Sequence, residues 1–531
     1  MAPASIKSLP IEIHTEILHV LLANSRRPAP ISFDDELTDM LSSSPPPTRP
    51  VVLELIVKKG PPGSLFPFNV ATVCKLWLDI LAPIPECWTR VIFDVAYDHT
   101  PFQDALLWSK NQETVIEFTV FNSLGDSTVD HVTEARRVSA ILEALQPHVH
   151  RCKSIIFDVT YSSSLPPPTL FLRQELPLLE ELTLDCRIDD MERRTDAWMH
   201  PTGSDQEKFP TSFPRLEKLS LTGFWFMHLA LHKPKWLNEV EFNYCPTIHV
   251  TRFAFLDRGF FTLAMFVYYI SKIGASQSFA FSHLSLSYDH KDAPGQLSDQ
   301  PYEFSCEHME FDSVSKGFLS HFYDIVNLHA NESQTFRNCE VPVVRQVHYG
   351  CELTLENIMD DNGRSLRNIL GAWSGIHINI SSCPSFNDTL ISWLGTEVEY
   401  AYADSPPIGG QEEDDLILHY SNRFTFSRRG FRTFPAEGIE WLSVHDCSNF
   451  TSGTLREFIV ARNNASIPMT KNGLLPKNGL DSSQKGFDVE RGSMQSLYVT
   501  GKCPALGQDD AGWFETYFKD MSGCWGGDEQ V

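Results

Sequence analysis

The sequence lacks three features that would place the chain in a familiar class: closely spaced cysteines, a long apolar run and a strongly basic segment. Its twelve cysteines include no C-x-x-C pair, and the nearest ones, such as Cys74 and Cys87, stand about a dozen residues apart. This spacing gives no support to a zinc ribbon. The first 23 residues carry acidic and histidine side chains within their apolar pattern, unlike a secretory signal. We therefore expect reduced, mostly buried thiols in a cytoplasmic or nuclear protein.

The most apolar stretch of the chain is also short. Residues 260–270 form a mostly apolar segment between Arg258 and Lys272. A helix needs about 20 apolar residues to cross a bilayer. The segment therefore predicts a buried helix, and no membrane partner is expected.

Basic residues are few in this chain. Lys and Arg number 43 against 68 Asp and Glu, which gives a formal net charge of −25, and no run is rich in Lys or Arg. Such a charge repels a phosphate backbone, so no nucleic-acid partner is expected, whereas a basic patch on a partner could still dock. Residues 411–415, a run with four acids, predict either a solvated loop or a dock for a basic partner.

Motifs of catalysis are missing as well. The sequence contains no G-x-x-x-x-G-K-[ST], G-x-G-x-x-G, H-E-x-x-H or G-x-S-x-G. Cys306 and His308 place a thiol near an imidazole, but chance readily supplies such a pair. We expect no catalytic, cofactor-binding or metal-binding residues. A hydrolase with an unfamiliar site would instead reveal itself by a deep pocket with convergent titratable groups.

One pattern recurs along the chain and is clearest in residues 439–458. Leu442 and Val444 alternate as in a strand with one buried face, and Cys447 follows three positions later. Apolar residues with helical spacing come next: Phe450, Leu455 and Phe458. A strand then a helix, in the order L-x-x-L-x-L-x-x-C/N, is the signature of a leucine-rich repeat. Residues 378–394 are nearly a second copy.

The apolar pair of the strand has many copies. They are Ile155/Phe157, Leu182/Leu184, Leu219/Leu221, Val240/Phe242, Leu284/Leu286, Met309/Phe311, Leu353/Leu355, Ile378/Ile380, Leu416/Leu418, Leu442/Val444 and Leu497/Val499. Many steps between copies fall near the 20–29 residues of one repeat, and longer steps are interpreted as a repeat with a long loop. Cys245, Cys383 and Cys447 hold the same place after their strands.

These copies predict an α/β fold. Residues 151–503 would form an irregular leucine-rich-repeat solenoid, a curved parallel sheet with outer helices and long loop insertions. The alternative is a set of unrelated buried strands in an ordinary α/β domain. Residues 93–150, with a strand near 115–121 between helices at 102–109 and 134–145, are either a connector or the first atypical repeats. The aromatic residues 504–531 are expected to cap the array.

The first 92 residues have a different character. Ser8 is a candidate N-cap, and apolar residues at three- and four-residue steps predict a helix that runs to about Asn24. Residues from about 25 to 66 are rich in Pro, Ser and Gly and predict a flexible insertion. Residues 68–81 predict a second helix, which a proline turn connects to Cys87, Trp88 and a strand.

This N-terminal segment resembles an F-box of the kind found in fungal F-box proteins with C-terminal leucine-rich repeats. The resemblance rests on three pieces, L-P-x-E-I, V-C-K-x-W-x-D-I and P-x-C-W, in the right order. The residues that match are Leu9, Pro10, Glu12, Ile13, Val73, Cys74, Trp77, Asp79, Ile80, Pro85 and Trp88. The match covers roughly the first 92 residues and departs from the family in the long insertion, which leaves the register of the module open.

The resemblance implies the substrate-recognition subunit of a Skp–cullin–F-box ubiquitin ligase. It implies that the module binds the Skp adaptor, and through it the cullin scaffold, while the repeats hold a target protein that the sequence does not identify. The adaptor-binding residues would be Leu9, Pro10, Ile13, Ile17, Val73, Cys74, Trp77, Ile80 and Trp88. Such a receptor needs no catalytic residue, because it works by holding a target near a charged enzyme.

The alternative is a leucine-rich-repeat interaction scaffold unconnected with ubiquitin, with N-terminal helices that only cap the array. That alternative predicts that Ile13 and Trp77 are fully buried within the chain.

Overall fold

The computed structural model divides the chain into two compact units, Met1–Arg252 and Phe253–Val531. The residues that the structure describes are 9–25, 66–97, 104–109, 115–124, 129–191, 212–233, 241–242, 247–256, 261–273, 278–288, 301–343, 350–358, 363–400, 431–436, 438–466, 494–517 and 523–525.

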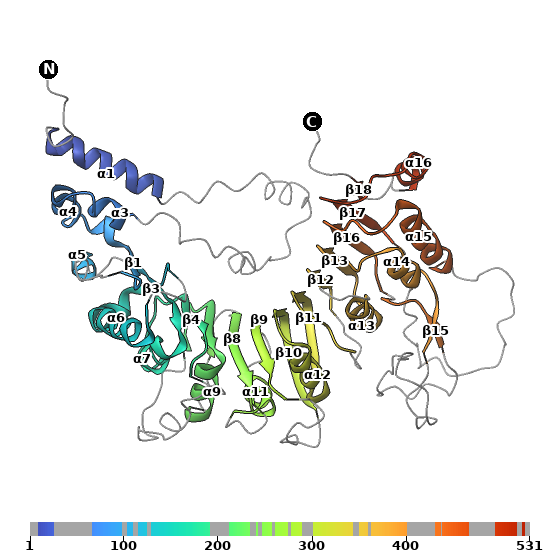
Figure 1. Ribbon diagram of the computed structural model, residues 1–531, viewed down its shortest axis with the longest axis horizontal. Helices are drawn as coiled ribbons and strands as arrows, with labels where there is room; N and C mark the ends of the chain where they lie inside the picture. Colours follow the sequence, from blue (N-terminus) through green and yellow to red (C-terminus); the bar gives the residue numbers. More distant parts are fainter. Residues whose placement is uncertain are drawn as a thin grey trace. The chain divides into compact units, whose positions relative to one another are not determined.

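The first unit begins with helices and continues as a parallel sheet (Figure 1). Its helical elements are α1 (Ile11–Ser25), α3 (Phe68–Ala71), α4 (Lys75–Leu81), η2 (Pro85–Trp88), α5 (Ala105–Trp108), α6 (His131–Leu145), η5 (Gln146–Arg151), η6 (Ser162–Ser164), α7 (Thr169–Leu172) and α9 (Gly223–His232). Its sheet has the order β1 (Arg90–Asp94), β2 (Ile116–Phe121), β3 (Cys152–Tyr161), β4 (Glu181–Ile188), β6 (Lys218–Thr222) and β8 (Thr247–Phe255), and every pair is parallel. β5 (Ser212–Phe213) and β7 (Glu241–Phe242) pair separately.

The second unit repeats a strand and a helix. Its strands are β9 (Ser278–Leu286), β10 (Tyr302–Asp312), β11 (Val326–Arg337), β12 (Glu352–Glu356), β13 (His377–Ser381), β16 (Trp441–His445), β17 (Ser496–Thr500) and β18 (Gly523–Trp525), all parallel to their neighbours. Its helices are α11 (Leu263–Ile270), α12 (Lys316–Ile325), α13 (Arg364–Ala372), α14 (Asp388–Leu394), α15 (Ser452–Ser466) and α16 (Gln508–Tyr517). β14 (Val398–Tyr400) and β15 (Phe431–Thr433) form an antiparallel pair.

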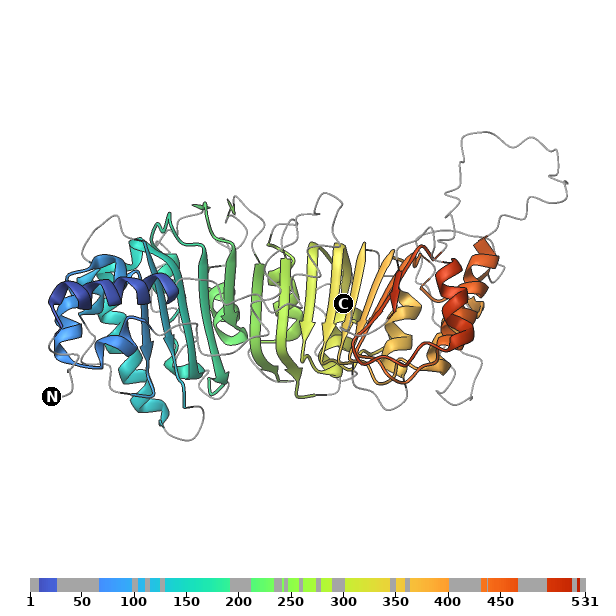
Figure 2. The ribbon, with the colours of Figure 1, turned by 90° about the horizontal axis from the view of Figure 1, so that it is seen from above.

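The apolar pairs of the repeat stand side by side in the sheet. In the first unit Ile155/Phe157, Leu182/Leu184 and Leu219/Leu221 are in register. In the second unit the register runs through Leu353/Leu355, Ile378/Ile380, Leu442/Val444 and Leu497/Val499. These side chains are buried. The predicted repeat register is therefore confirmed for these strands, and the strands lie side by side within each unit (Figure 2).

β1 and β2 extend the sheet of the first unit. Val91 pairs with Phe118, which pairs in turn with Ile155 of the repeat ladder. A buried polar network fixes α6 to these strands. The side chain of Glu134 accepts hydrogen bonds from Asn122 Nδ2 at 2.8 Å and from the backbone N–H groups of Thr160 and Tyr161. β1, β2 and β3 are thus neighbouring strands of one sheet, and α6 covers them.

The strands of the second unit end in the same kind of turn. The second residue after each buried pair has a left-handed φ near 50–70°, at His283, Ser313, Asn338, Asn357, Ser382, Asp446 and Gly501. For a residue with a Cβ this conformation costs about 1–2 kcal/mol. The N–H groups of Ser313, Asn338, Asn357, Ser382 and Asp446 offset the cost by donating to the next strand, as from Asn357 to the Ser381 carbonyl at 2.9 Å.

The next position along six of these seven turns explains the recurring cysteines. It is buried and holds Leu284, Val314, Cys339, Ile358, Cys383 or Cys447, whereas Lys502 after Gly501 is exposed. The Cys383 thiol donates to the Ser381 carbonyl at 3.2 Å, and burial raises its pKa to about 12, so it stays protonated. Seven of the ten cysteines whose side chains the structure describes are buried, and none of the ten is in a disulfide. Cys245 lies outside the described residues.

Several predicted elements were wrong in detail. Phe242 belongs to the small β5–β7 pair, and the ladder of β9 uses Phe279 and Phe281 where we expected Leu284 and Leu286. The helix predicted at 102–109 spans only Ala105–Trp108. Val240 and the pair Leu416/Leu418 lie outside the described residues, as does the acidic run 411–415.

Besides the short strands β5, β14, β15 and β18, two strands of the ladder were missed. β8 places Ile248 and Val250 in the ladder, and β11 places Gln334 and Phe336 there. A polar residue at the ladder position of β11 hid that strand, whereas the pair Ile248/Val250 of β8 has the form of the other copies and was overlooked.

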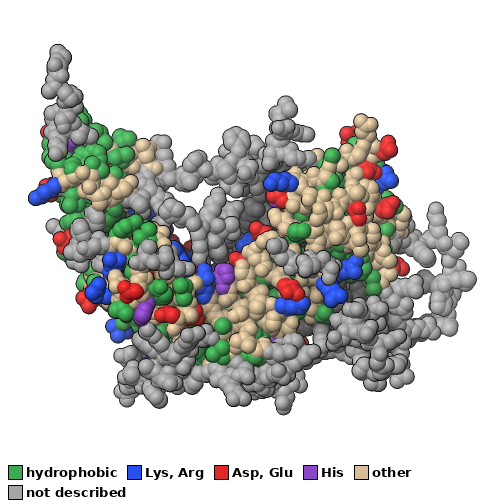
Figure 3. Space-filling view, in the orientation of Figure 1, with side chains coloured by type: hydrophobic (Ala, Val, Ile, Leu, Met, Phe, Trp, Pro, Cys, Tyr) green, Lys and Arg blue, Asp and Glu red, His purple; other side chains and the backbone are tan. Residues whose placement is uncertain are grey.

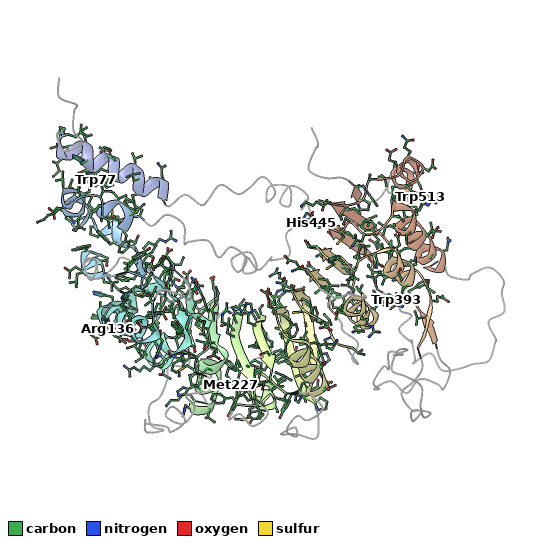
Figure 4. All side chains as sticks on the ribbon, viewed as in Figure 1. Trp77, Arg136, Met227, Trp393, His445 and Trp513 are labelled. Atoms are coloured by element: carbon green, nitrogen blue, oxygen red, sulfur yellow. The ribbon has the colours of Figure 1, made fainter. Side chains whose placement is uncertain are left out.

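Other expectations were met. The apolar segment 260–270 contains α11, whose apolar face is buried. Near the C-terminus, the Phe450 ring lies 6.1 Å from the Trp525 ring, which lies 5.2 Å from that of Phe514 on α16. The aromatic tail therefore packs on the last repeat elements, with Trp513 also on the helix side of the unit (Figure 4).

Candidate functional site

The N-terminal helices are joined by a pair of side chains from either side of the long insertion. His14 on α1 is buried, and its Nδ1 accepts a hydrogen bond from Trp77 Nε1 on α4 at 3.1 Å. The two rings meet edge to face with centroids 6.3 Å apart. Because an indole N–H can only donate, Nδ1 of His14 carries no proton here. The pair holds α1 against α4, with Trp77 between them (Figure 4).

The second helix of this module is broken. We expected one helix over residues 68–81, but the chain forms α3, leaves the helix, and restarts at Lys75 after Cys74. Cys74 is extended, with φ −163° and ψ 159°. Thr72 and Val73 are β-branched and favour helices weakly, which fits an interruption at this point. The break turns the Val73 side chain outward, so that it is 63% exposed.

Trp88 anchors the module to the sheet. It is fully buried, and its Nε1 donates to the Leu81 carbonyl at 2.9 Å. Its ring lies 5.6 Å from Phe68 and 4.5 Å from Trp108. Because η2 ends at Trp88 and β1 begins at Arg90, the helices form one body with the first strand.

The outer surface of these helices is apolar. Ile13, Ile17 and Val20 share one side of α1, since at 100° per residue they fall within about 60° of one another and opposite the buried Leu18. Ile13 is 46% exposed. The other exposed large apolar side chains of the module are Leu9, Ile11, Val20, Val73 and Leu76, and hydrophobic side chains gather over this part of the molecule (Figure 3). We call these six residues the aliphatic face; at 100° per residue, Ile11 lies about 160° around α1 from Ile13, toward the other side of the helix.

The nine residues predicted to bind the adaptor divide by their position. Leu9, Pro10, Ile13 and Val73 are exposed, and Ile17, Cys74 and Trp77 are half-buried. Ile80 and Trp88 lie in the interior of the unit, so they support the aliphatic face without belonging to it. Ile11, Val20 and Leu76 were not predicted. The seven-residue step from Ile13 to Val20 was the signal in the sequence that marked Val20.

The chemistry of the aliphatic face is that of a contact surface. Its neighbours Glu12, Glu16, Lys75 and Asp79 are exposed and of both signs, a polar rim around an apolar centre. Contiguous apolar surface with a polar rim marks interaction sites in soluble proteins.

The thiol and imidazole of β10 do not form a pair. A register shift between Cys306 and His308 places the Cys306 side chain in the core, whereas the Nδ1 atom of His308 lies 2.9 Å from Ser333 Oγ. Burial lowers the pKa of His308. Within the described ranges, no three His, Cys, Asp or Glu side chains gather at metal-binding distances. Across the same part of the chain, no helix is both long and apolar enough to cross a bilayer.

Comparison with known proteins adds no relative to this picture. No family model matches the chain, and no curated protein matches it.

Proposed function

We propose that this chain is the substrate-recognition subunit of a Skp–cullin–F-box ubiquitin ligase, with α1, α3 and α4 as its F-box and the repeats as its target-binding part. The observation that carries the proposal is the aliphatic face. A folded module that buries Trp88 and Leu18 completely still leaves six large aliphatic side chains in water. The sequence resemblance supplies the identity of the occupant, a helical Skp adaptor.

The energetics favour an occupied face. Covering a Leu, Ile or Val side chain fully contributes about 1.5–3 kcal/mol. Together the six residues expose the equivalent of about three side chains, so covering them contributes about 5–9 kcal/mol. Binding at 1 μM needs about 8 kcal/mol net of the association costs, so contacts beyond the aliphatic face must add to it. Cys74 and Trp77 at the edge of the face would be covered with it.

The alternative of a scaffold unconnected with ubiquitin predicts that Ile13 and Trp77 are fully buried. Ile13 is instead 46% exposed, and Trp77 is half-buried. This arrangement favours a docking role over simple capping of the sheet.

The test is a binding titration of the full-length protein with the purified Skp adaptor. We expect micromolar or tighter binding by the wild type. Val73→Asp and Ile13→Asp should each weaken it at least about 100-fold, because a carboxylate would be buried without a partner.

Val132→Asp is the matched control. Val132 lies in the first turn of α6 and is 63% exposed, as Val73 is, but it lies outside the module. Its substitution should leave adaptor binding unchanged. A folded wild type that does not bind, or equal losses in Val73→Asp and Val132→Asp, would overturn the proposal.

A further inference from the structure

The sheet of the second unit has one face that the helices leave open. Helices α13, α14 and α15 cover the buried ladder side, whereas the alternate residues of β10–β17 point to the other side, where His445 lies (Figures 1 and 4). In register, three rows cross this face: His308–Ser333–Glu352–His377–Trp441–Ser496, Glu310–Thr335–Thr354–Asn379–Ser443–Tyr498, and Asp312–Arg337–Glu356–Ser381–His445–Thr500. We call it the open strand face.

Carboxylates on the open strand face outnumber cations. Arg337 lies between two of them, with its Nη1 atom 2.5 Å from Glu310 and its Nε atom 2.7 Å from Glu356. One guanidinium balances Glu356, while burial raises the pKa of Glu310 to about 7 and leaves that side chain partly protonated near neutral pH. The excess negative charge of the face therefore rests on its other carboxylates.

Two further carboxylates have only neutral partners. Asp312 Oδ1 accepts from Asn338 Nδ2 at 2.8 Å, and Glu352 Oε1 accepts from Asn379 Nδ2 at 2.5 Å. Among the described residues, no Lys or Arg pairs with Asp312 or Glu352. These two acids are available to a cation from outside.

An aromatic platform lies two strands from Glu352. Trp441 is 37% exposed, and its ring is 5.1 Å from that of His377. Ile376, whose carbonyl accepts from the Trp441 N–H, is exposed beside it, and Tyr498 lies on the adjoining strand. An exposed indole supported from one side is a strong anchor for an apolar or cationic side chain.

The spacing of acid and indole sets the geometry of an occupant. Glu352, His377 and Trp441 are direct neighbours across three strands. Adjacent strands are about 4.8 Å apart, so Glu352 and Trp441 are separated by about 10 Å at the backbone. An extended chain covers that distance in about three residues.

We propose that the open strand face binds an extended basic segment of the target protein, with a Lys or Arg at Glu352 and a large apolar or aromatic residue on Trp441 about three positions away. This inference rests on the proposed function, because it names the chemistry of the target that the receptor would hold. The net charge of −25 would steer such a segment toward the protein.

Charge selects this occupant over the alternatives. A second copy of the chain would bring the same negative face, and a nucleic acid would bring phosphates, so both are repelled. A basic peptide gains from the uncompensated Asp312 and Glu352 and needs no rearrangement of the Arg337 pair.

The test uses the full-length protein and an array of labelled 12-residue Gly/Ser peptides. Each peptide carries one Arg and one Phe, separated by one to six positions, and binding is read by fluorescence anisotropy. We expect the tightest binding at a separation near three, loss when Glu replaces the Arg, and weakening with added salt. Trp441→Ala should weaken the best peptide about tenfold, and Glu352→Gln about fivefold.

Glu181→Gln is the matched control, because Glu181 occupies a strand of the first unit and already pairs with Lys218 at 2.8 Å. It should leave peptide binding unchanged. The proposal is overturned if no peptide of the array binds below 1 mM, or if the binding ignores peptide charge or Trp441→Ala. Adaptor binding of the same samples is measured separately, so a failure here leaves the F-box proposal standing, and the converse also holds.

Discussion

Helices α1 and α12 have the same kind of apolar stripe and opposite surroundings. On α12, Phe318 and Phe322 are buried, and the Phe322 ring lies 5.6 Å from Phe311 of β10 and 6.1 Å from Phe281 of β9. On α1, Ile13 and Val20 are exposed. The apolar side chains of a helix inside the array are buried against its strands, whereas Ile13 and Val20 of α1 remain exposed. The difference indicates where the chain has left surface for a partner.

Removing a buried side chain of α12 should lower the free energy of unfolding more than any of the other substitutions. Phe322→Ala leaves a cavity among packed rings and should lower the free energy of unfolding by about 3–5 kcal/mol. Adaptor binding by the fraction that stays folded should not change. Urea denaturation monitored by circular dichroism measures the loss. A loss below 1 kcal/mol would mean that α12 packs no more closely against its neighbours than α1 does.

The free energy of unfolding should depend on pH through Glu310, a buried side chain of β10. Glu310 is 6% exposed, and burial raises its pKa to about 7, against the opposing effect of Arg337. The folded state then holds its proton more tightly than the unfolded chain, whose glutamate has the ordinary value of 4.5. The contribution of the protonated Glu310 side chain to the free energy of unfolding is therefore greatest below pH 4.5. It falls as the pH rises to about 7, by up to about 3 kcal/mol.

Glu310→Gln isolates this contribution, because the amide does not titrate. Between pH 4.5 and pH 8, the unfolding free energy of the wild type should fall by about 3 kcal/mol relative to that of Glu310→Gln. Denaturation at the two pH values measures it. A difference that is independent of pH would show that Glu310 is ionised throughout.

The hydrogen bond between α1 and α4 should have a smaller effect. Trp77→Phe keeps a ring against His14 but removes the indole donor, and should cost about 1–2 kcal/mol. The loss should be confined to the N-terminal helices, since Trp88 still anchors them. Proteolysis in the insertion, followed over time, would detect the loosening. Unchanged cleavage would indicate that other contacts hold the two helices.

Truncating the open stripe should have the smallest effect on stability. Ile13→Ala removes a side chain that is already half in water, so the unfolding free energy should change by no more than about 0.5 kcal/mol. The same change should weaken adaptor binding about tenfold or more. Denaturation and titration of the same sample measure both. A loss of stability comparable to that of Phe322→Ala would show that Ile13 is a core residue.

The sequence predicted the repeat where side chains obey period two. Leu353/Leu355 and Leu442/Val444 were placed correctly because both members of each pair are aliphatic and enter the core. Gln334 occupies the same ladder position with a polar side chain, so β11 could not be recognised. The left-handed turn position has no residue signature, since histidine, serine, asparagine, aspartate and glycine all occupy it.

The sequence identified several residues of the candidate site but did not show which of them are exposed. The spacing on α1 identified Ile13 and Ile17, but periodicity alone does not tell an outward stripe from an inward one. Ile80 and Trp88 matched a motif and turned out to be core residues. The break at Cys74, which exposes Val73, depends on local backbone geometry that a helical pattern over 68–81 conceals.

The most direct measurement of the central claim is amide hydrogen exchange of the full-length protein with and without the purified Skp adaptor. The aliphatic face predicts slower exchange in peptides from α1 and from α3 through α4 when the adaptor is bound. Peptides from β3 and β4 should be unchanged. Protection on the open strand face of β12–β16 with α1 unaffected, or no change anywhere at saturating adaptor, would contradict the assignment of the N-terminal helices as the docking site.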